Sequence, residues 1–109
     1  MASTWAALSD PQRRAAMALL LERPRAVGEL VQELGLSQPG TSKHLRVLRD
    51  AGLVRVRTDA QRRVYEVDPA PLAELDLWLE PYRALWGASL ELLEAHLDHT
   101  HPTRQETSE

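Results

Sequence analysis

The chain has 109 residues, which suits one compact domain and is too short for two. Its formal net charge of −3 comes with an ordinary globular composition, which favours neither a basic nucleic-acid tail nor a membrane-surface peptide. The absence of cysteine excludes disulfides, thiolate zinc sites and thiol redox sensing. Neither a signal peptide nor a membrane span is expected, so the composition predicts a soluble cytoplasmic protein. Because a monomer of this size buries only about 60–68% of the surface of its unfolded chain, a symmetric dimer is also expected.

The first quarter of the chain predicts two helices. Residues 1–8 contain a short apolar run that suits a first helix. Asp10 followed by Pro11 is typical of a helix start, because Asp accepts hydrogen bonds from free first-turn amides and Pro fits the first helical position. We expect this second helix to end near residue 22, just before Pro24.

The next segment predicts a helix-turn-helix. Residues 26–34 carry apolar side chains at helical spacing, and Gly35 suits the left-handed backbone that closes a helix. Ser37 is then expected to cap a second helix that has Pro39 in its first turn and ends at Gly52. A helix, a short turn containing Gly and a capped second helix form the helix-turn-helix pattern.

The remainder predicts a β-hairpin and a long helix. Residues 53–57 and 62–67 alternate as strands do, with residues 58–61 as the loop between them. A helix is expected from Asp68 and Pro69 to about residue 99, kinked or split by Pro81. The predicted fold class is therefore mainly α with a small β-hairpin wing: a winged helix-turn-helix with a long C-terminal dimerisation helix. Residues 1–99 would form this domain, and residues 100–109 a disordered tail.

Charge is segregated along the chain. Residues 37–65 hold seven basic and two acidic side chains, whereas residues 66–109 hold two basic and ten acidic ones. The positive charge thus lies on the second helix of the pair and on the hairpin, the elements that a winged helix lays on DNA.

On a helical wheel, the second helix of the pair turns polar and basic residues outward. Gln38, Ser42 and Lys43 suit contacts to base edges, while arginines suit phosphates or a minor groove. His44 lies at the edge of the buried arc and is interpreted as a half-buried spacer. The predicted DNA-binding residues are Ser37, Gln38, Pro39, Thr41, Ser42, Lys43, Arg46, Arg49, Arg57, Arg62 and Arg63.

Four segments together resemble the ArsR/SmtB family of winged-helix repressors. They are residues 7–14 (ALSDPQRR), 27–30 (VGEL), 36–48 (LSQPGTSKHLRVL) and 51–54 (AGLV). The resemblance implies a homodimer built from the first and last helices that binds an inverted-repeat operator and represses its own operon. The apolar stripe of the last helix supports such pairing. The predicted dimer residues are Trp5, Leu8, Tyr82, Trp86, Leu90 and Leu93.

Both metal sites of that family are replaced in this chain. Residues 29–34 contain no cysteine pair, and the last-helix zinc positions hold Trp78, Ser89 and Leu92. The chain therefore resembles the metal-independent members, and no cofactor is expected. The remaining metal candidates are His96, His99 and His101, whose spacing suits only weak binding.

Other functions stay open at this point. One is a metal-responsive regulator with a weak nickel or zinc site at those histidines, and another is a protein-interaction dimer that does not bind DNA. An enzyme is not expected, because the chain has no cysteine, suggests no Ser-His-acid arrangement and has no glycine-rich phosphate loop. The sequence does not identify an inducer, whether a small molecule or a protein.

Overall fold

The structure, a computed structural model, describes the backbone of residues 2–100 and the side chains of residues 3–87 and 94. It contains five helices and three strands within that range. The helices are α1 (Ala2–Leu8), α2 (Pro11–Glu22), α3 (Val27–Leu34), α4 (Gln38–Asp50) and α5 (Ala70–Thr100). The strands are β1 (Arg25–Ala26), β2 (Val54–Asp59) and β3 (Arg62–Val67). The chain divides into two compact units, Met1–Leu75 and Asp76–Glu109.

The helix ends follow the local signals in the sequence. The Asp10 carboxylate accepts hydrogen bonds from the backbone amides of Gln12 and Arg13, at 2.7 and 3.3 Å, and so begins α2. Gly35 closes α3 with φ +66°, a left-handed conformation that glycine adopts without steric cost. The Ser37 hydroxyl accepts from the Gly40 amide at 3.1 Å and begins α4. The predicted helix-turn-helix is confirmed.

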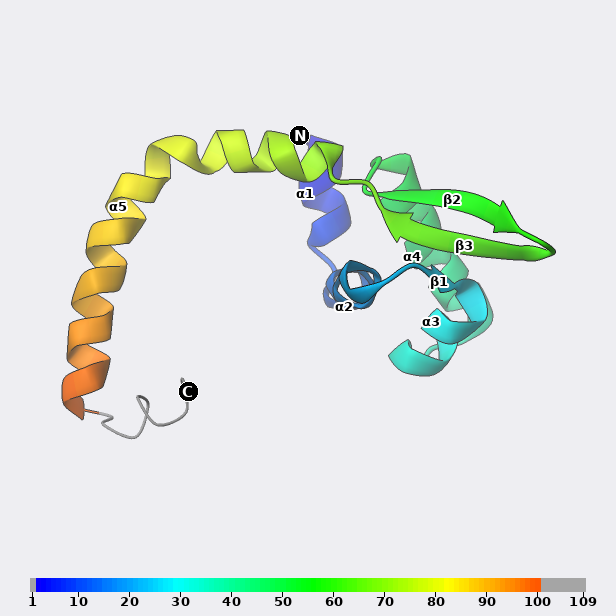
Figure 1. The fold of residues 1–109 in the computed structure, drawn as a ribbon, viewed down its shortest axis with the longest axis horizontal. Coiled ribbons are helices and arrows are strands. Elements are labelled where there is room, and N and C mark those ends of the chain that lie inside the picture. Colours follow the sequence, from blue (N-terminus) through cyan, green and yellow to red (C-terminus); the bar gives the residue numbers. More distant parts are fainter. Residues whose placement is uncertain (1, 101–109) are drawn as a thin grey trace. The chain divides into compact units, whose positions relative to one another are not determined.

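The strands form a three-stranded antiparallel sheet in the order β1-β3-β2. Figure 1 shows β2 and β3 extending together as a ribbon beyond the helices of the first unit. Strand β1, which was not predicted from the sequence, adds two residues to the free edge of β3. The predicted loop over residues 58–61 is also too long: Asp59 still pairs with Arg62, and Ala60 makes the tight turn with φ +58°. Without glycine or asparagine, this turn carries no sequence signal.

The core of the first unit lies where α1–α4 meet the inner half of the hairpin. Its fully buried side chains include Leu30 from α3, Leu45 and Leu48 from α4, and Leu53 just before β2. Val54, Val64 and Tyr65 extend this core into the sheet. Helix α4 and the base of the wing are therefore held against one apolar cluster.

Helix α5 begins as predicted but is continuous across Pro81. The Asp68 carboxylate accepts from the Ala70 amide at 3.1 Å. Of the kink or split predicted at Pro81, the split does not occur, because the helix is unbroken from Ala70 to Thr100. No helix in the described part of the chain combines the length and apolarity that a membrane span requires. Residue 100, the first of the predicted tail, still belongs to α5, while residues 101–109, including His101, lie outside the described residues. The domain boundary near residue 99 stays a prediction.

Candidate nucleic-acid interface

Helix α4 separates its two faces cleanly. Leu45 and Leu48 are fully buried, whereas the side chains of Gln38, Lys43 and Arg46 are exposed. Pro39 and Arg49 are exposed as well, and Ser42 is half-buried. The predicted outward arc of polar and basic groups is thus available to a partner along the whole helix.

Thr41 belongs to the other face of α4. Its side chain is fully buried and its hydroxyl donates to the Ser37 carbonyl at 2.9 Å. The prediction that Thr41 contacts DNA directly is therefore wrong for its side chain, because position 41 falls on the arc that faces the core. Thr41 instead stabilises the first turn of α4. The Ser37 hydroxyl does the same, because it accepts the hydrogen bond from the Gly40 amide.

His44 is half-buried at the edge of α4, as expected of a spacer. Its Nδ1 lies 3.5 Å from Nη1 of Arg13 on α2. The Arg13 Nε donates to the Ala7 carbonyl at 2.6 Å. These contacts join α4 to α1 and α2, so His44 helps to pack α4 against these helices.

The basic side chains differ in how they are paired. On the wing, Arg57 lies 3.8 Å from Glu66, and Arg62 lies 3.2 Å from Glu29. By contrast, four cations have neither an ion pair nor a hydrogen bond to any residue in the described part of the chain. They are Lys43, Arg46, Arg49 and Arg63. Guanidinium and ammonium groups without an internal partner are the ones ready to meet phosphates.

Three of these unpaired cations meet around one cavity of about 290 Å³ between α4 and β3. Arg46 and Arg49 line it from the helix, and Arg63 lines it from the strand. Ser42, Asp50 and Tyr65 complete its walls. Three guanidinium groups outweigh the single Asp50 carboxylate, so the cavity suits an oxyanion such as a phosphate group.

Sequence reasoning did not identify Asp50, Tyr65 or Glu29 as part of this region. For Tyr65 a signal existed, because alternate residues of a strand share a face and Arg63 lies two positions before it. For Glu29 no local signal exists. Its partner Arg62 is far along the chain, and only the fold brings the two together.

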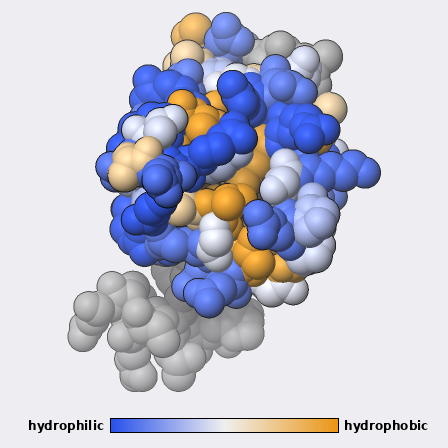
Figure 2. Space-filling view, turned by 90° about the vertical axis from the view of Figure 1, so that its right-hand side faces the viewer, coloured by the Kyte–Doolittle hydropathy of each residue, from blue (hydrophilic) through white to orange (hydrophobic). Residues whose placement is uncertain are grey.

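A second cavity, of about 680 Å³, lies between the hairpin and the start of α3. Its apolar part is made by Ala26, Val27 and Gly28, and its polar rim includes Glu29 and Arg62. Figure 2 views the wing end, where mostly hydrophilic residues surround a hollow that has hydrophobic residues in it. On this side the hairpin therefore borders a cavity and not packed side chains.

The predicted dimer residues lie in both units. Trp5 on α1 is 45% exposed, while Leu8 packs partly against the core. On α5, Tyr82 and Trp86 are 44% and 47% exposed, and the ring centroids of Trp78 and Tyr82 lie 5.1 Å apart. The side chains of the other predicted dimer and metal residues lie outside the described residues. They are Leu90, Leu93, His96 and His99.

Comparison with known proteins places these features in context. Residues 10–56 match the family described as "Bacterial regulatory protein, arsR family". The chain is 44% identical over 98 residues to the HTH-type transcriptional regulator Rv2034 of Mycobacterium tuberculosis, covering 88% of this chain and 91% of the relative.

Two solved structures share the fold. The transcriptional repressor BigR from Xylella fastidiosa is 35% identical with a TM-score of 0.60, over 76% of this chain and 83% of that one. The homodimeric winged helix-turn-helix DNA-binding domain of Mb0332 from Mycobacterium bovis is 25% identical with a TM-score of 0.63, over 92% and 83%. The matched length includes both the helix-turn-helix and the wing.

Proposed function

Because the chain belongs to the arsR family of bacterial regulatory proteins, we propose that it is a homodimeric, sequence-specific DNA-binding repressor that acts on an inverted-repeat operator. The observation that carries this proposal is the grouping of unpaired cations. Lys43, Arg46, Arg49 and Arg63 lie on α4 and β3 and are left without internal partners in the described part of the chain. On a basic surface that only contacts solvent, unpaired cations would not be expected to gather on one helix and the adjacent strand, as they do here on α4 and β3.

In this proposal the exposed face of α4 divides its tasks. Gln38, in the first turn, carries an amide that can pair bidentately with adenine in the major groove. Ser42 and Lys43 follow one turn later and contact further base edges. Arg46, Arg49 and Arg63 surround the polar cavity and hold a backbone phosphate there.

A symmetric dimer would present two such faces at once. The homodimeric domain from Mycobacterium bovis supports this arrangement, as do the exposed aromatic side chains of α5. In winged helix-turn-helix dimers the two recognition helices lie about 34 Å apart, one turn of DNA. The proposed operator is therefore an inverted repeat whose half-sites are one helical turn apart.

Selection of bound sequences from a random duplex library tests this proposal. The expected result is an enriched inverted repeat, which is then sought in the promoter of the protein's own gene. Occlusion of that promoter in transcription with purified polymerase would establish repression. Enrichment of no sequence, together with equally weak binding to every duplex, would overturn the proposal and favour a protein-interaction dimer.

A further inference from the structure

The wing is anchored at only one end. Its inner half contributes buried residues to the core, among them Val54, Val64 and Tyr65. Its outer half, residues 57–63, is exposed throughout and extends beyond the helices in Figure 1. Cavities lie on either side of the Glu29–Arg62 contact, one of about 680 Å³ and one of about 300 Å³. Apolar packing therefore does not fix the direction of the outer half.

One polar contact joins this outer half to the helices. Nη2 of Arg62 donates to Oε1 of Glu29 on α3 at 3.2 Å. Arg55 and Arg57 instead pair with Glu66 and so stay within the hairpin. Among the side chains that the structure describes, no other ion pair or hydrogen bond links residues 57–63 to a helix.

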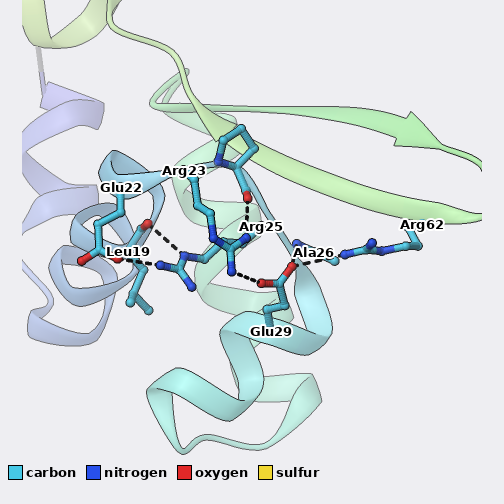
Figure 3. A network of polar contacts seen from close by, with 8 residues as sticks. Leu19, Glu22, Arg23, Arg25, Ala26, Glu29 and Arg62 are labelled. Carbon is cyan, nitrogen blue, oxygen red and sulfur yellow. Dashed lines mark hydrogen bonds and ion pairs between the residues drawn. The ribbon is translucent and has the colours of Figure 1, made fainter.

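Glu29 is itself held in place from two sides. Its Oε2 accepts from Nη2 of Arg23 at 2.6 Å, and its Oε1 also accepts from the Ala26 backbone amide at 3.3 Å. Figure 3 shows Arg23 and Arg62 converging on this carboxylate from opposite sides. Because Arg23 is the C-cap of α2 and Ala26 is the N-cap of α3, both of these contacts hold the Glu29 carboxylate from outside the wing.

We propose that Glu29 is a positioning residue that holds the outer half of the wing through Arg62, so that Arg63 faces the DNA backbone. This inference rests on the proposed DNA-binding function, but the contact it describes exists in the free protein. It gives the neighbours Arg62 and Arg63 different tasks, although both were predicted to contact the DNA backbone or a minor groove. Arg62 is bound internally, whereas Arg63 is unpaired beside the α4 cavity.

The first test uses the full-length protein without DNA. Amide hydrogen exchange over residues 57–63 reports local opening of the outer wing. Exposed ion pairs contribute little, so Arg62→Gln and Glu29→Gln should each speed this exchange by about twofold to fivefold. Glutamine at position 29 can still accept from the Ala26 amide, which preserves the start of α3. Arg62→Lys keeps the positive charge and N–H donors that can reach Glu29, so it should retain the slow exchange. Arg57→Gln is the control, because the partner of Arg57 is Glu66 within the hairpin.

The second test measures DNA binding against salt. Arg62→Gln should weaken operator binding about twofold to fivefold with an unchanged salt slope, because no phosphate contact is lost. Arg63→Gln should lower the slope by about 0.9 for each phosphate contact removed. An equal fall of the slope in both variants would show that Arg62 contacts phosphate and would overturn the inference.

The two tests separate this inference from the proposed function. Unchanged exchange in both Arg62→Gln and Glu29→Gln, in a protein that binds its operator, overturns the positioning role alone. Faster exchange in a protein that binds no duplex leaves the wing contact established and overturns the DNA-binding function instead.

Discussion

The aromatic surface of α5 gives a sharp prediction for dimer formation. Trp86 is 47% exposed, and Tyr82 and Trp78, which lie about one and two helical turns before it, have similar exposure. In the proposed homodimer this surface is covered by the second copy. Trp86→Ala removes the indole and should therefore weaken the dimer without disturbing the buried core of the first unit.

The size of the effect follows from the exposed area. A tryptophan side chain offers up to about 250 Å², so the 47% exposed fraction corresponds to about 115 Å². At about 25 cal/mol per Å², burying this area contributes about 3 kcal/mol for each Trp86. A symmetric dimer buries two copies, and allowing for the area that alanine keeps, the loss is about 4–6 kcal/mol. The dimer dissociation constant should rise by about a thousandfold to ten-thousandfold.

Sedimentation equilibrium over a range of concentrations measures this constant directly. Leu77→Ala is the matched control, because Leu77 is 72% exposed and, nine residues earlier on the same helix, faces about 180° away from Trp86. Its dissociation constant should stay within about tenfold of the wild-type value. A wild-type chain that is monomeric at micromolar concentration would refute the reasoning, as would a Trp86→Ala dimer as tight as the Leu77→Ala dimer.

Further predictions concern recognition, acidity and metals. Gln38→Ala should cost about 1–3 kcal/mol on the operator and relax preference at one position of each half-site, whereas Arg63→Gln should weaken operator and scrambled duplexes alike in a salt titration. The hydrogen bonds from Arg23 and from the Ala26 amide lower the pKa of Glu29 below its ordinary value of 4.5. The stability that these hydrogen bonds to the ionised Glu29 carboxylate contribute is present above pH 4.5 and is lost as the pH falls through the lower pKa of the folded protein. Glu29→Gln should therefore flatten the acid side of a pH–stability curve measured by urea unfolding. Nickel, zinc, cadmium and arsenite should leave operator affinity unchanged, and a shift above about tenfold that disappears when His96, His99 and His101 are all replaced by alanine would contradict this.

Most of the fold could be predicted because its signals are local. The start of α2 depends on the Asp10 carboxylate and amides two and three residues further on. The end of α3 depends on the φ +66° of Gly35, and the start of α4 depends on Ser37 and the amide of Gly40. Each of these contacts spans three residues or fewer, so a reading of neighbouring residue types is sufficient. The buried and exposed arcs of α4 follow in the same way from helical periodicity.

The elements that sequence reasoning missed depend on distant partners. Strand β1 has only two residues, too few for an alternating pattern, and it exists because the edge of β3 offers hydrogen bonds to Arg25 and Ala26. The burial of Tyr65 likewise depends on the helices that pack over the base of the hairpin. No short stretch of the sequence contains both partners of such a contact, so local patterns cannot predict it.

The amino-acid sequence by itself thus determined the helix-turn-helix, the hairpin and the surplus of positive charge over residues 37–65, because composition, caps and periodicity are properties of neighbouring residues. Only the tertiary structure decided which of those charges are available. Arg62 and Arg63 are chemically identical and adjacent, yet the fold brings a carboxylate from α3 to the first and leaves the second unpaired beside α4. Arg62 differs from Arg63 because it meets Glu29, which lies 33 positions earlier in the sequence and is brought close only by the packing of the folded chain.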